Sequence, residues 1–470
     1  MIQILIIAAF VCARLRESVG NPHPLQFGWA YALLPCLLGW LVVQGRARMA
    51  VRSMDSRGSL TAARHADTLA TFTRILAGIS LCFALLLTDW PSLAATPVAG
   101  TPLLTDLVAI LPLFLMVLGQ WSALYPIERR LRDAMLLRQL DSGQPVYPPP
   151  TRGQHLWNRT RFEVLLVLAP ILLASLWHEG VTRLPAIVGH SALSAHAWEL
   201  IVAALSWVGL IGVMVLAPVV LRWVWDLVPI GSGPLRDQAD AMCRQYRVRV
   251  RGPFLWRTHG TLINAAILGV AWPFRYLLFS DAMLDRFSQE QVEAVMAHEV
   301  AHVRERHLMW IGITLAAALF TLPWVIEPLL PRGHTSGTTE AWIDITLLLV
   351  VGAIFGFVSR RFEWQADAFA VRHLSQRLAP SQPNISIDAA RIMAGTLAHV
   401  AALNGIPVRR FSFRHGSIAL RCRKVMALAG RPVHKLAQDR VSRVIKLGSL
   451  LLLSLAIAAL FFQATRGSAP

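Results

Sequence analysis

Long apolar runs alternate along the chain with polar segments that are rich in arginine. We interpret nine of these runs as helices that cross or enter a bilayer, since a membrane span needs roughly 20 predominantly apolar residues. They cover residues 2–13, 27–43, 75–87, 102–125, 164–177, 198–221, 308–330, 341–358 and 447–462. The first run is short, so whether it forms a full span is left open. The pattern predicts a mainly α, polytopic α-helical integral membrane protein.

Arginine is concentrated in every second segment between these runs. The basic segments are 44–74, 126–162, 222–307 and 359–446, whereas 90–101, 179–197 and 331–340 carry at most one Arg or Lys each. Positively charged loops stay on the cytoplasmic side, so the alternation predicts an N-terminus inside, nine spans and a C-terminus outside. Arg14 and Arg16 fit this arrangement poorly. The preference for Arg over Lys points to a bacterial protein, and so to the cytoplasmic (inner) membrane.

Composition and charge narrow the class of protein further. Of the 470 residues, 55% are hydrophobic and only 15% are charged, which is too apolar for an ordinary soluble protein. The net charge of +18 comes from arginines beside apolar runs, which indicates contact with an anionic lipid bilayer and argues against nucleic-acid binding. The five cysteines form no C-x-x-C pair and predict neither a disulfide framework nor a metal site.

Residues 298–302 read His-Glu-Val-Ala-His, the pattern H-E-x-x-H. On a helix His298 and His302 share one face and can occupy two corners of a tetrahedral Zn²⁺ site. Glu299 lies beside them, where it can act as a general base on water. The pattern therefore predicts one zinc ion per chain at a hydrolytic site.

The setting of this motif is helical. Ser288 is expected as the N-cap and Gln291 as its partner in a capping box, and apolar residues follow at helical spacing. The alternative is a capped core helix with two hydrogen-bonded histidines. A glutamate between paired histidines is costly to bury without a use, which favours the metal site.

A zinc site needs a third protein ligand. Glu363 and Asp367 lie four residues apart on one helical face, where Glu363 can bind the metal and Asp367 can accept a hydrogen bond from a ligand histidine. A solvated, charged start of a helix is the alternative. His307, five residues after His302, could point at the site, but a position at the lipid interface is the favoured interpretation.

The combination of H-E-x-x-H with E-x-x-A-D after a membrane hairpin resembles a family of membrane zinc metallopeptidases, which includes type I CaaX prenyl endopeptidases and HtpX-like proteases. The resemblance covers roughly residues 235–430 and implies a cytoplasmic α+β zincin-like (gluzincin) protease domain. Asn264-Ala265 resembles the family's edge strand that holds the substrate backbone. His415 stands where the family has a histidine near the scissile carbonyl, which implies a catalytic role. Arg421 matches an arginine that braces the glutamate ligand.

The cytoplasmic segments predict the remaining elements of this domain. A helix is expected over 235–246 and strands over 246–252, 261–270 and 275–279, forming a short sheet that could accept an extended peptide. The expected organisation is 1–230 with about six spans, 231–307 with the zinc helix, 308–358 as a transmembrane hairpin, 359–446 with the third ligand, and 447–470 as the last span and tail.

The function that follows is a zinc metalloendopeptidase acting on membrane-associated or misfolded proteins at the cytoplasmic face. One alternative is an antirepressor-type signalling receptor protease, against which the short tail after the last span argues. The other is a non-catalytic metal-binding membrane scaffold. The expected partners are a peptide or protein substrate and the lipid bilayer, and the oligomeric state is left open.

Overall fold

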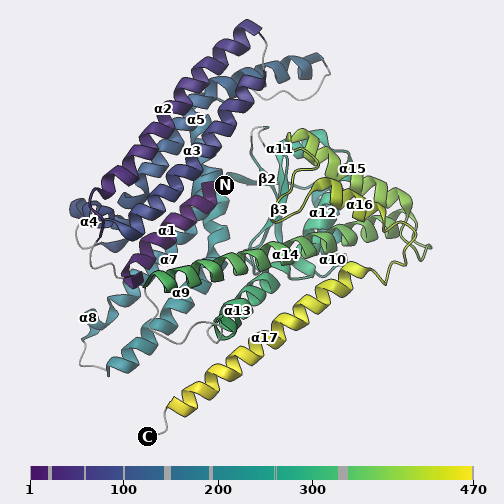
Figure 1. The fold of residues 1–470 in the computed structure, drawn as a ribbon. Helices are drawn as coiled ribbons and strands as arrows, with labels where there is room; N and C mark the ends of the chain where they lie inside the picture. Colours follow the sequence, from purple (N-terminus) through teal and green to yellow (C-terminus); the bar gives the residue numbers. More distant parts are fainter. Residues whose placement is uncertain are drawn as a thin grey trace. The chain divides into compact units, whose positions relative to one another are not determined.

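A computed structural model of the protein divides into two compact units, Met1–Trp225 and Asp226–Pro470 (Figure 1). The structure describes residues 2–19, 24–57, 60–98, 101–141, 150–189, 194–258, 260, 262–326 and 337–467. Helices dominate both units, and the one sheet among the described residues lies in the second. The expectation of a mainly α membrane protein is confirmed.

The regular elements described in the first unit are all helices. Its elements are α1 (Ile2–Val19), α2 (Gly28–Arg57), α3 (Leu60–Leu87), α4 (Trp90–Ala95), η1 (Thr96–Val98), α5 (Pro102–Asp141), α6 (Arg152–Arg159), η2 (Thr160–Leu165), α7 (Leu166–Thr182), α8 (Leu184–Val188) and α9 (Ala195–Val224). Helices α2, α3 and α5 pack against one another, with α1 beside α3 and α7 beside α9. Leu81 and Trp121 are buried among them.

The second unit combines a small sheet with helices. Its elements are β1 (Leu227–Pro229), α10 (Pro234–Gln245), β2 (Arg251–Trp256), β3 (Ala265–Leu268), β4 (Tyr276–Ser280), α11 (Asp281–Arg286), α12 (Gln289–Arg304), α13 (His307–Ile326), α14 (Gly337–Leu378), α15 (Ile387–Leu403), α16 (Ile418–Met426) and α17 (Ala437–Gly467). One apolar core joins the sheet to α12, α14, α15 and α16. Phe279, Met296 and Leu374 are among its fully buried side chains.

The sheet has the strand order β1-β2-β4-β3, which leaves β3 at an edge. Strand β4 is buried along its whole length and runs parallel to β2 and antiparallel to β3. The sequence pattern placed one strand at 246–252, whereas β2 begins at Arg251 and ends at Trp256. Arg247 has a φ of 54°, which interrupts an extended chain there, and Phe254 and Trp256 supply the buried positions. The three-residue strand β1 is too short to produce a detectable pattern.

Seven described helices are long and apolar enough to cross a membrane by length and composition. They are Gly28–Ser56, Thr61–Leu87, Pro102–Ala134, Arg152–Val188, Ala195–Val224, His307–Ile326 and Ala437–Ala459. The first expected run corresponds to Ile2–Leu15, an apolar helix that is shorter than these. The expected run 341–358 lies within α14, but it includes side chains outside the described part of the chain, as does the end of 308–330. Those two predictions are therefore not tested over their full length.

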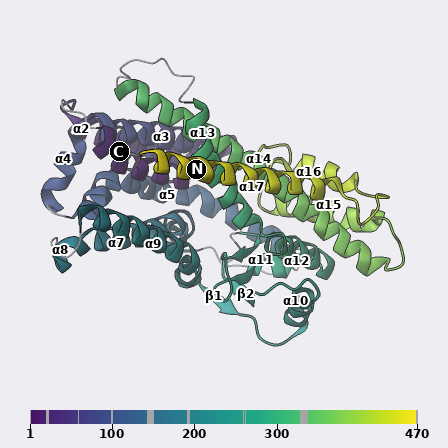
Figure 2. The same ribbon diagram turned by 90° about the horizontal axis from the view of Figure 1, so that it is seen from below.

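Several arginine-rich segments that the pattern assigned to loops are helical extensions of the spans. Helix α2 continues to Arg57 and α5 to Asp141. Arginine is a good helix former, so nothing in these segments ends the helix where the apolar run ends. In the second unit α13, α14 and α17 pack side by side, which Figure 2 shows from below.

Helix α12 is positioned by both its cap and its burial. Ser288 and Gln291 form the expected capping box, with the Ser288 hydroxyl accepting from the Gln291 backbone N–H and the Gln291 side chain accepting from the Ser288 N–H, both at 3.3 Å. Beyond the first turn the helix contacts β3, α14 and α15. A helix that is buried on several sides has little freedom to rotate, so its histidines are held in one direction.

Candidate metal centre

Two helices bring three ligand atoms together. His298 and His302 project from one face of α12, and Glu363 projects from α14, which packs against it. One ligand atom from each of the three residues lies within 4.8 Å of the others. The two histidine Nε2 atoms are 3.2 Å apart, and they lie 3.6 and 3.8 Å from the Glu363 carboxylate oxygens. The i,i+4 spacing on α12 and the crossing of α14 thus build one cluster.

Asp367 orients the first histidine. Its Oδ1 lies 3.0 Å from His298 Nδ1, so the other ring nitrogen of His298 is the one that faces Glu363. Burial would lower the pKa of His298, but its hydrogen bonds to Asp367 and Glu363 outweigh burial and raise that pKa to about 10. Glu363 and Asp367 both lie on α14, one turn apart, so a single helix face supplies the candidate ligand and the group that orients its neighbour.

His307 orients the second histidine. Its Nδ1 lies 2.9 Å from His302 Nδ1, and its Nε2 lies 3.0 Å from the Gln365 side-chain oxygen. The ring stacks on Phe362 and is only 2% exposed. Gln365 can only accept through that oxygen, so His307 Nε2 donates, His307 Nδ1 accepts from His302 Nδ1, and the His302 Nε2 lone pair is left for a metal. Burial lowers the pKa of His302 to about 4.

The prediction that placed His307 at the lipid interface is therefore wrong about the contacts of this side chain, which point at the site. Helix α12 ends at Arg304, and Arg306 has a φ of 55°, a left-handed conformation that turns the chain sharply into α13. This turn brings His307 back against His302. An arginine in that conformation gives no sequence signal, because glycine or asparagine would be the expected residue there.

Arg421 neutralises the two acidic groups of the site, Asp367 and Glu363. It donates to the two oxygens of Asp367 at 2.9 and 2.7 Å, and another of its nitrogens lies 3.3 Å from Glu363. Burial would raise the pKa of each carboxyl, but the Arg421 charge holds the pKa of Glu363 well below its usual range and also lowers that of Asp367. His415 contributes from the other side, with its Nδ1 3.0 Å from Glu363.

Glu299 lies next to the cluster and contacts the sheet. Its Oε2 accepts a hydrogen bond of 3.2 Å from the backbone N–H of Ile267 in β3. Burial raises the pKa of Glu299 to about 7, with the nearby His298 charge opposing the shift. Glu299 is not one of the three clustered ligand atoms, which leaves its carboxylate free to exchange protons.

The outer edge of β3 faces this glutamate. The Asn264 C=O accepts from the Ser280 backbone N–H, and the Asn264 N–H donates to the Ser280 hydroxyl, so in the antiparallel register Ala265 and Ile267 turn their backbone N–H and C=O groups away from β4. The side chain of Ala265 is buried, whereas that of Asn264 is exposed. The sequence-predicted site residues of α12, α14, α16 and the loop before it form one cluster, and Asn264 and Ala265 lie on the strand that contacts Glu299.

The donor set fits a zinc ion. Two neutral imidazoles and one carboxylate are the ligands of catalytic zinc sites, which keep a further position open. Each histidine already has a partner on its other ring nitrogen, as ligand histidines do. Without a cation, two histidine nitrogens 3.2 Å apart and a buried carboxylate would have little reason to converge.

Sequence reasoning missed a second buried network on α12. Glu293 accepts from Arg377 at 2.9 Å and contacts His373 at 3.0 Å, and the other nitrogen of His373 lies 2.8 Å from the Tyr246 hydroxyl. It lies apart from the metal ligands and fixes α12 to α14. The i,i+4 spacing of His373 and Arg377 was the only available signal, and it does not identify the partner.

The segment that carries this site is similar to a known protein family. Residues 253–390 match peptidase family M48, and this segment contains α12 and Glu363. A Protease HtpX homolog of Neisseria meningitidis serogroup C is 27% identical over 150 residues, covering 29% of this chain and 52% of the relative. A Protease HtpX homolog of Verminephrobacter eiseniae is 26% identical over 171 residues, covering 33% and 54%. The chain thus spans about half the length of these relatives.

Among solved structures, the crystal structure of S. mikatae Ste24p matches with a TM-score of 0.48 and 12% identity, covering 86% of this chain and 100% of that one. The family match and the HtpX homologues confirm the resemblance found in the sequence. The segment 253–390, which carries the histidine–glutamate cluster, is thus similar to peptidase family M48 and to Protease HtpX homologs.

Proposed function

We propose that this protein is a membrane-embedded zinc metalloendopeptidase, which hydrolyses peptide bonds of membrane-associated or misfolded proteins at the cytoplasmic face. The observation that carries the proposal is the convergence of His298, His302 and Glu363 beside Glu299. The match of this segment to peptidase family M48, and the name protease borne by its relatives, support the same activity.

His298, His302 and Glu363 would hold one Zn²⁺ per chain. When bound, zinc polarises a carbonyl oxygen and lowers the pKa of a water molecule, which is the chemistry that peptide hydrolysis needs. Asp367 and Arg421 would keep His298 and Glu363 in place, because each contact seen between them restrains a ligand side chain.

Glu299 would be the general base and then the general acid. A carboxylate oxygen of Glu299 takes a proton from the attacking water, and the same oxygen later gives that proton to the amine that leaves. Glu299 lies beside the candidate ligands and is half-buried, so its carboxylate is placed to exchange the proton with the reactants. Its bond from Ile267 would hold the carboxylate at the strand where a substrate would lie.

His415 would stabilise the negative charge that develops on the carbonyl oxygen. It reaches Glu363 through Nδ1, and its side chain is 46% exposed, which leaves the ring accessible from the substrate side. Asn264 and Ala265 would bind the substrate as an added strand, because Ala265 turns backbone groups to the free edge of β3.

The location at the inner membrane of a bacterium rests on the arginine pattern. The segments that contain the two halves of the candidate metal centre, 222–307 and 359–446, are both among the basic ones. Positively charged segments remain on the cytoplasmic side, so both halves of the site would lie on that side of the bilayer.

The test compares the wild type with Glu299→Gln as purified full-length proteins in detergent. Metal content and the cleavage of casein or of the chain itself are measured in parallel. We expect about one zinc per chain in both proteins and cleavage in the wild type alone, because glutamine preserves the shape of the side chain and cannot accept the proton.

Two outcomes contradict the proposal. A fully active Glu299→Gln protein would show that Glu299 is not the general base. Absence of zinc from both proteins would show that these residues do not form a metal site. Zinc in both with cleavage in neither would favour a non-catalytic metal-binding scaffold.

A further inference from the structure

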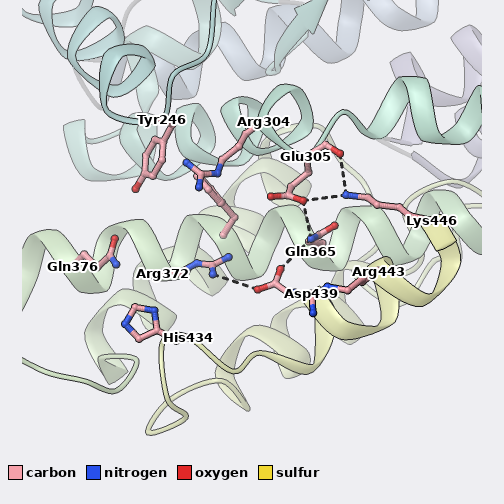
Figure 3. A pocket seen from close by; sticks show the side chains of 11 residues that line it. Tyr246, Arg304, Glu305, Gln365, Arg372, Gln376, His434, Asp439, Arg443 and Lys446 are labelled. Carbon is pink, nitrogen blue, oxygen red and sulfur yellow. Dashed lines mark hydrogen bonds and ion pairs between the residues drawn. The ribbon is translucent and has the colours of Figure 1, made fainter.

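A polar pocket lies in the second unit, lined by side chains other than the candidate zinc ligands. It has a volume of about 510 Å³ and lies between the end of α12, the C-terminal third of α14 and the first turns of α17 (Figure 3). Its lining consists of Tyr246, Arg304, Glu305, Gln365, Phe369, Arg372, Gln376, His434, Asp439, Arg443 and Lys446. This volume is within the range of about 300–1,000 Å³ that is typical of small-molecule sites.

The two acidic groups of the pocket are already neutralised within it. Asp439 lies 3.3 Å from Arg372 and accepts a hydrogen bond of 3.0 Å from Gln365. Glu305 accepts from Lys446 at 3.0 Å and from Gln365 at 3.2 Å. Each carboxylate therefore has its own cation, and the dashed contacts in Figure 3 form one connected network.

Two further cations are left over. Within the described part of the chain, no carboxylate lies at ion-pair distance from Arg304 or Arg443. The Arg304 guanidinium lies over the rings of Tyr246 and Phe369, at 5.3 and 5.8 Å from their centroids. Stacking on rings orients the planar group and leaves its in-plane N–H donors available, which is how arginines are arranged where they receive an anion. The pocket thus carries an excess of positive charge.

The pocket lies where two candidate spans begin. Arg304 and Glu305 directly precede α13, whose candidate span starts at His307, and Asp439, Arg443 and Lys446 lie in the first turns of α17. Basic side chains at the end of a span lie at the depth of lipid headgroups, where an anionic phosphate is available.

We propose that this pocket binds a phosphate-bearing anion, held by Arg304 and Arg443. Guanidinium groups match phosphate oxygens with paired N–H donors, and Lys446 and Arg372 keep Glu305 and Asp439 from repelling the ligand. The phosphate comes from an anionic phospholipid headgroup or from a free phosphate compound, which share this chemistry. The proposal is independent of peptide hydrolysis, since it uses no candidate zinc ligand.

The experiment titrates the purified full-length protein in neutral detergent with three probes, at matched ionic strength, by calorimetry. The probes are inorganic phosphate, short-chain phosphatidylglycerol and short-chain phosphatidylcholine. We expect saturable binding of phosphatidylglycerol or of phosphate, and weakening by roughly tenfold or more in the Arg304→Gln/Arg443→Gln double variant, since each lost charge-assisted bond costs about a factor of ten. Preference for phosphatidylglycerol over phosphate assigns the lipid headgroup, and equal or tighter binding of phosphate assigns a free anion.

Arg440→Gln is the matched control. Arg440 lies on α17 one turn from Arg443, is exposed and does not line the pocket, so its removal costs the same charge as the single Arg443→Gln variant and leaves binding within about twofold. The single Arg443→Gln variant replaces the double variant if melting shows that the latter is unfolded, because Arg443 is exposed. The proposal is overturned if neither anion binds, if phosphatidylcholine binds equally well, or if Arg440→Gln weakens binding as much as the pocket variant.

Discussion

Arg421 holds Asp367 by two parallel hydrogen bonds of 2.9 and 2.7 Å, and a third nitrogen of the same guanidinium lies 3.3 Å from Glu363. One buried cation thus compensates two buried carboxylates on successive turns of α14. Asp367 in turn lies 3.0 Å from His298, so the arginine on α16 is connected to candidate ligands on both α12 and α14. The position of the candidate metal centre therefore depends on a residue far from either motif.

Replacing this arginine should weaken metal binding. We expect Arg421→Gln to lower zinc affinity by about 10–100-fold, because Asp367 and Glu363 lose the group that fixes them. Removing one partner of a buried ion pair also costs about 3–5 kcal/mol of stability. Zinc affinity is measured by competition with a chelator, and stability by thermal melting. Arg423→Gln, at an exposed position of the same helix, should change neither, and an unchanged zinc affinity in Arg421→Gln would contradict the bracing role.

The contact between His307 and His302 predicts a second loss of affinity. In His307→Phe the ring can still stack on Phe362, but His302 loses the acceptor that fixes its tautomer. We expect zinc affinity to fall by about tenfold or more, with little change in melting temperature of the metal-free protein. His307→Gln keeps an acceptor and should lose less. Equal zinc affinity in His307→Phe and the wild type would show that His302 is oriented by other contacts.

The free edge of β3 allows a test of substrate binding. Ala265 is the first residue of an edge strand, where proline is tolerated, and its backbone N–H points away from β4. Ala265→Pro should therefore fold and bind zinc, but lose one hydrogen bond to an added substrate strand. We expect KM for a peptide substrate to rise by about two- to tenfold. If KM is unchanged while zinc is bound, the substrate does not pair with this residue.

Zinc should stabilise the second unit. A ligand that binds only the folded state adds about 2.7 kcal/mol at a free concentration one hundred times its Kd, so adding a strong chelator should lower the melting temperature by several degrees. The His298→Ala/His302→Ala double variant should show no zinc-dependent shift, whereas Glu299→Gln should keep it. A shift of equal size in the double variant would mean that zinc binds elsewhere.

Periodicity and local chemistry in the sequence were sufficient to predict α12, which carries His298 and His302, and most of the candidate spans. The Ser288–Gln291 capping box, the four-residue spacing of His298 and His302, and that of Glu363 and Asp367 are all set within one turn or two of helix. Such local patterns predict the structure correctly because a spacing of three to four residues places side chains on one face of the helix that forms. The apolar runs are equally local, since a bilayer leaves the backbone few alternatives.

Tertiary structure decided the contacts that complete the site. Sequence spacing alone could not place His307 against His302, because that contact depends on the left-handed turn at Arg306, and it could not find the partners of Glu293 on another helix. The polar pocket likewise collects side chains from three helices that are distant in the chain. The sequence by itself determined which helices carry the candidate ligands and which segments are apolar. Only the packing of α12, α14, α16 and α17 determined which charged side chains contact one another, because long-range pairing depends on how whole helices cross.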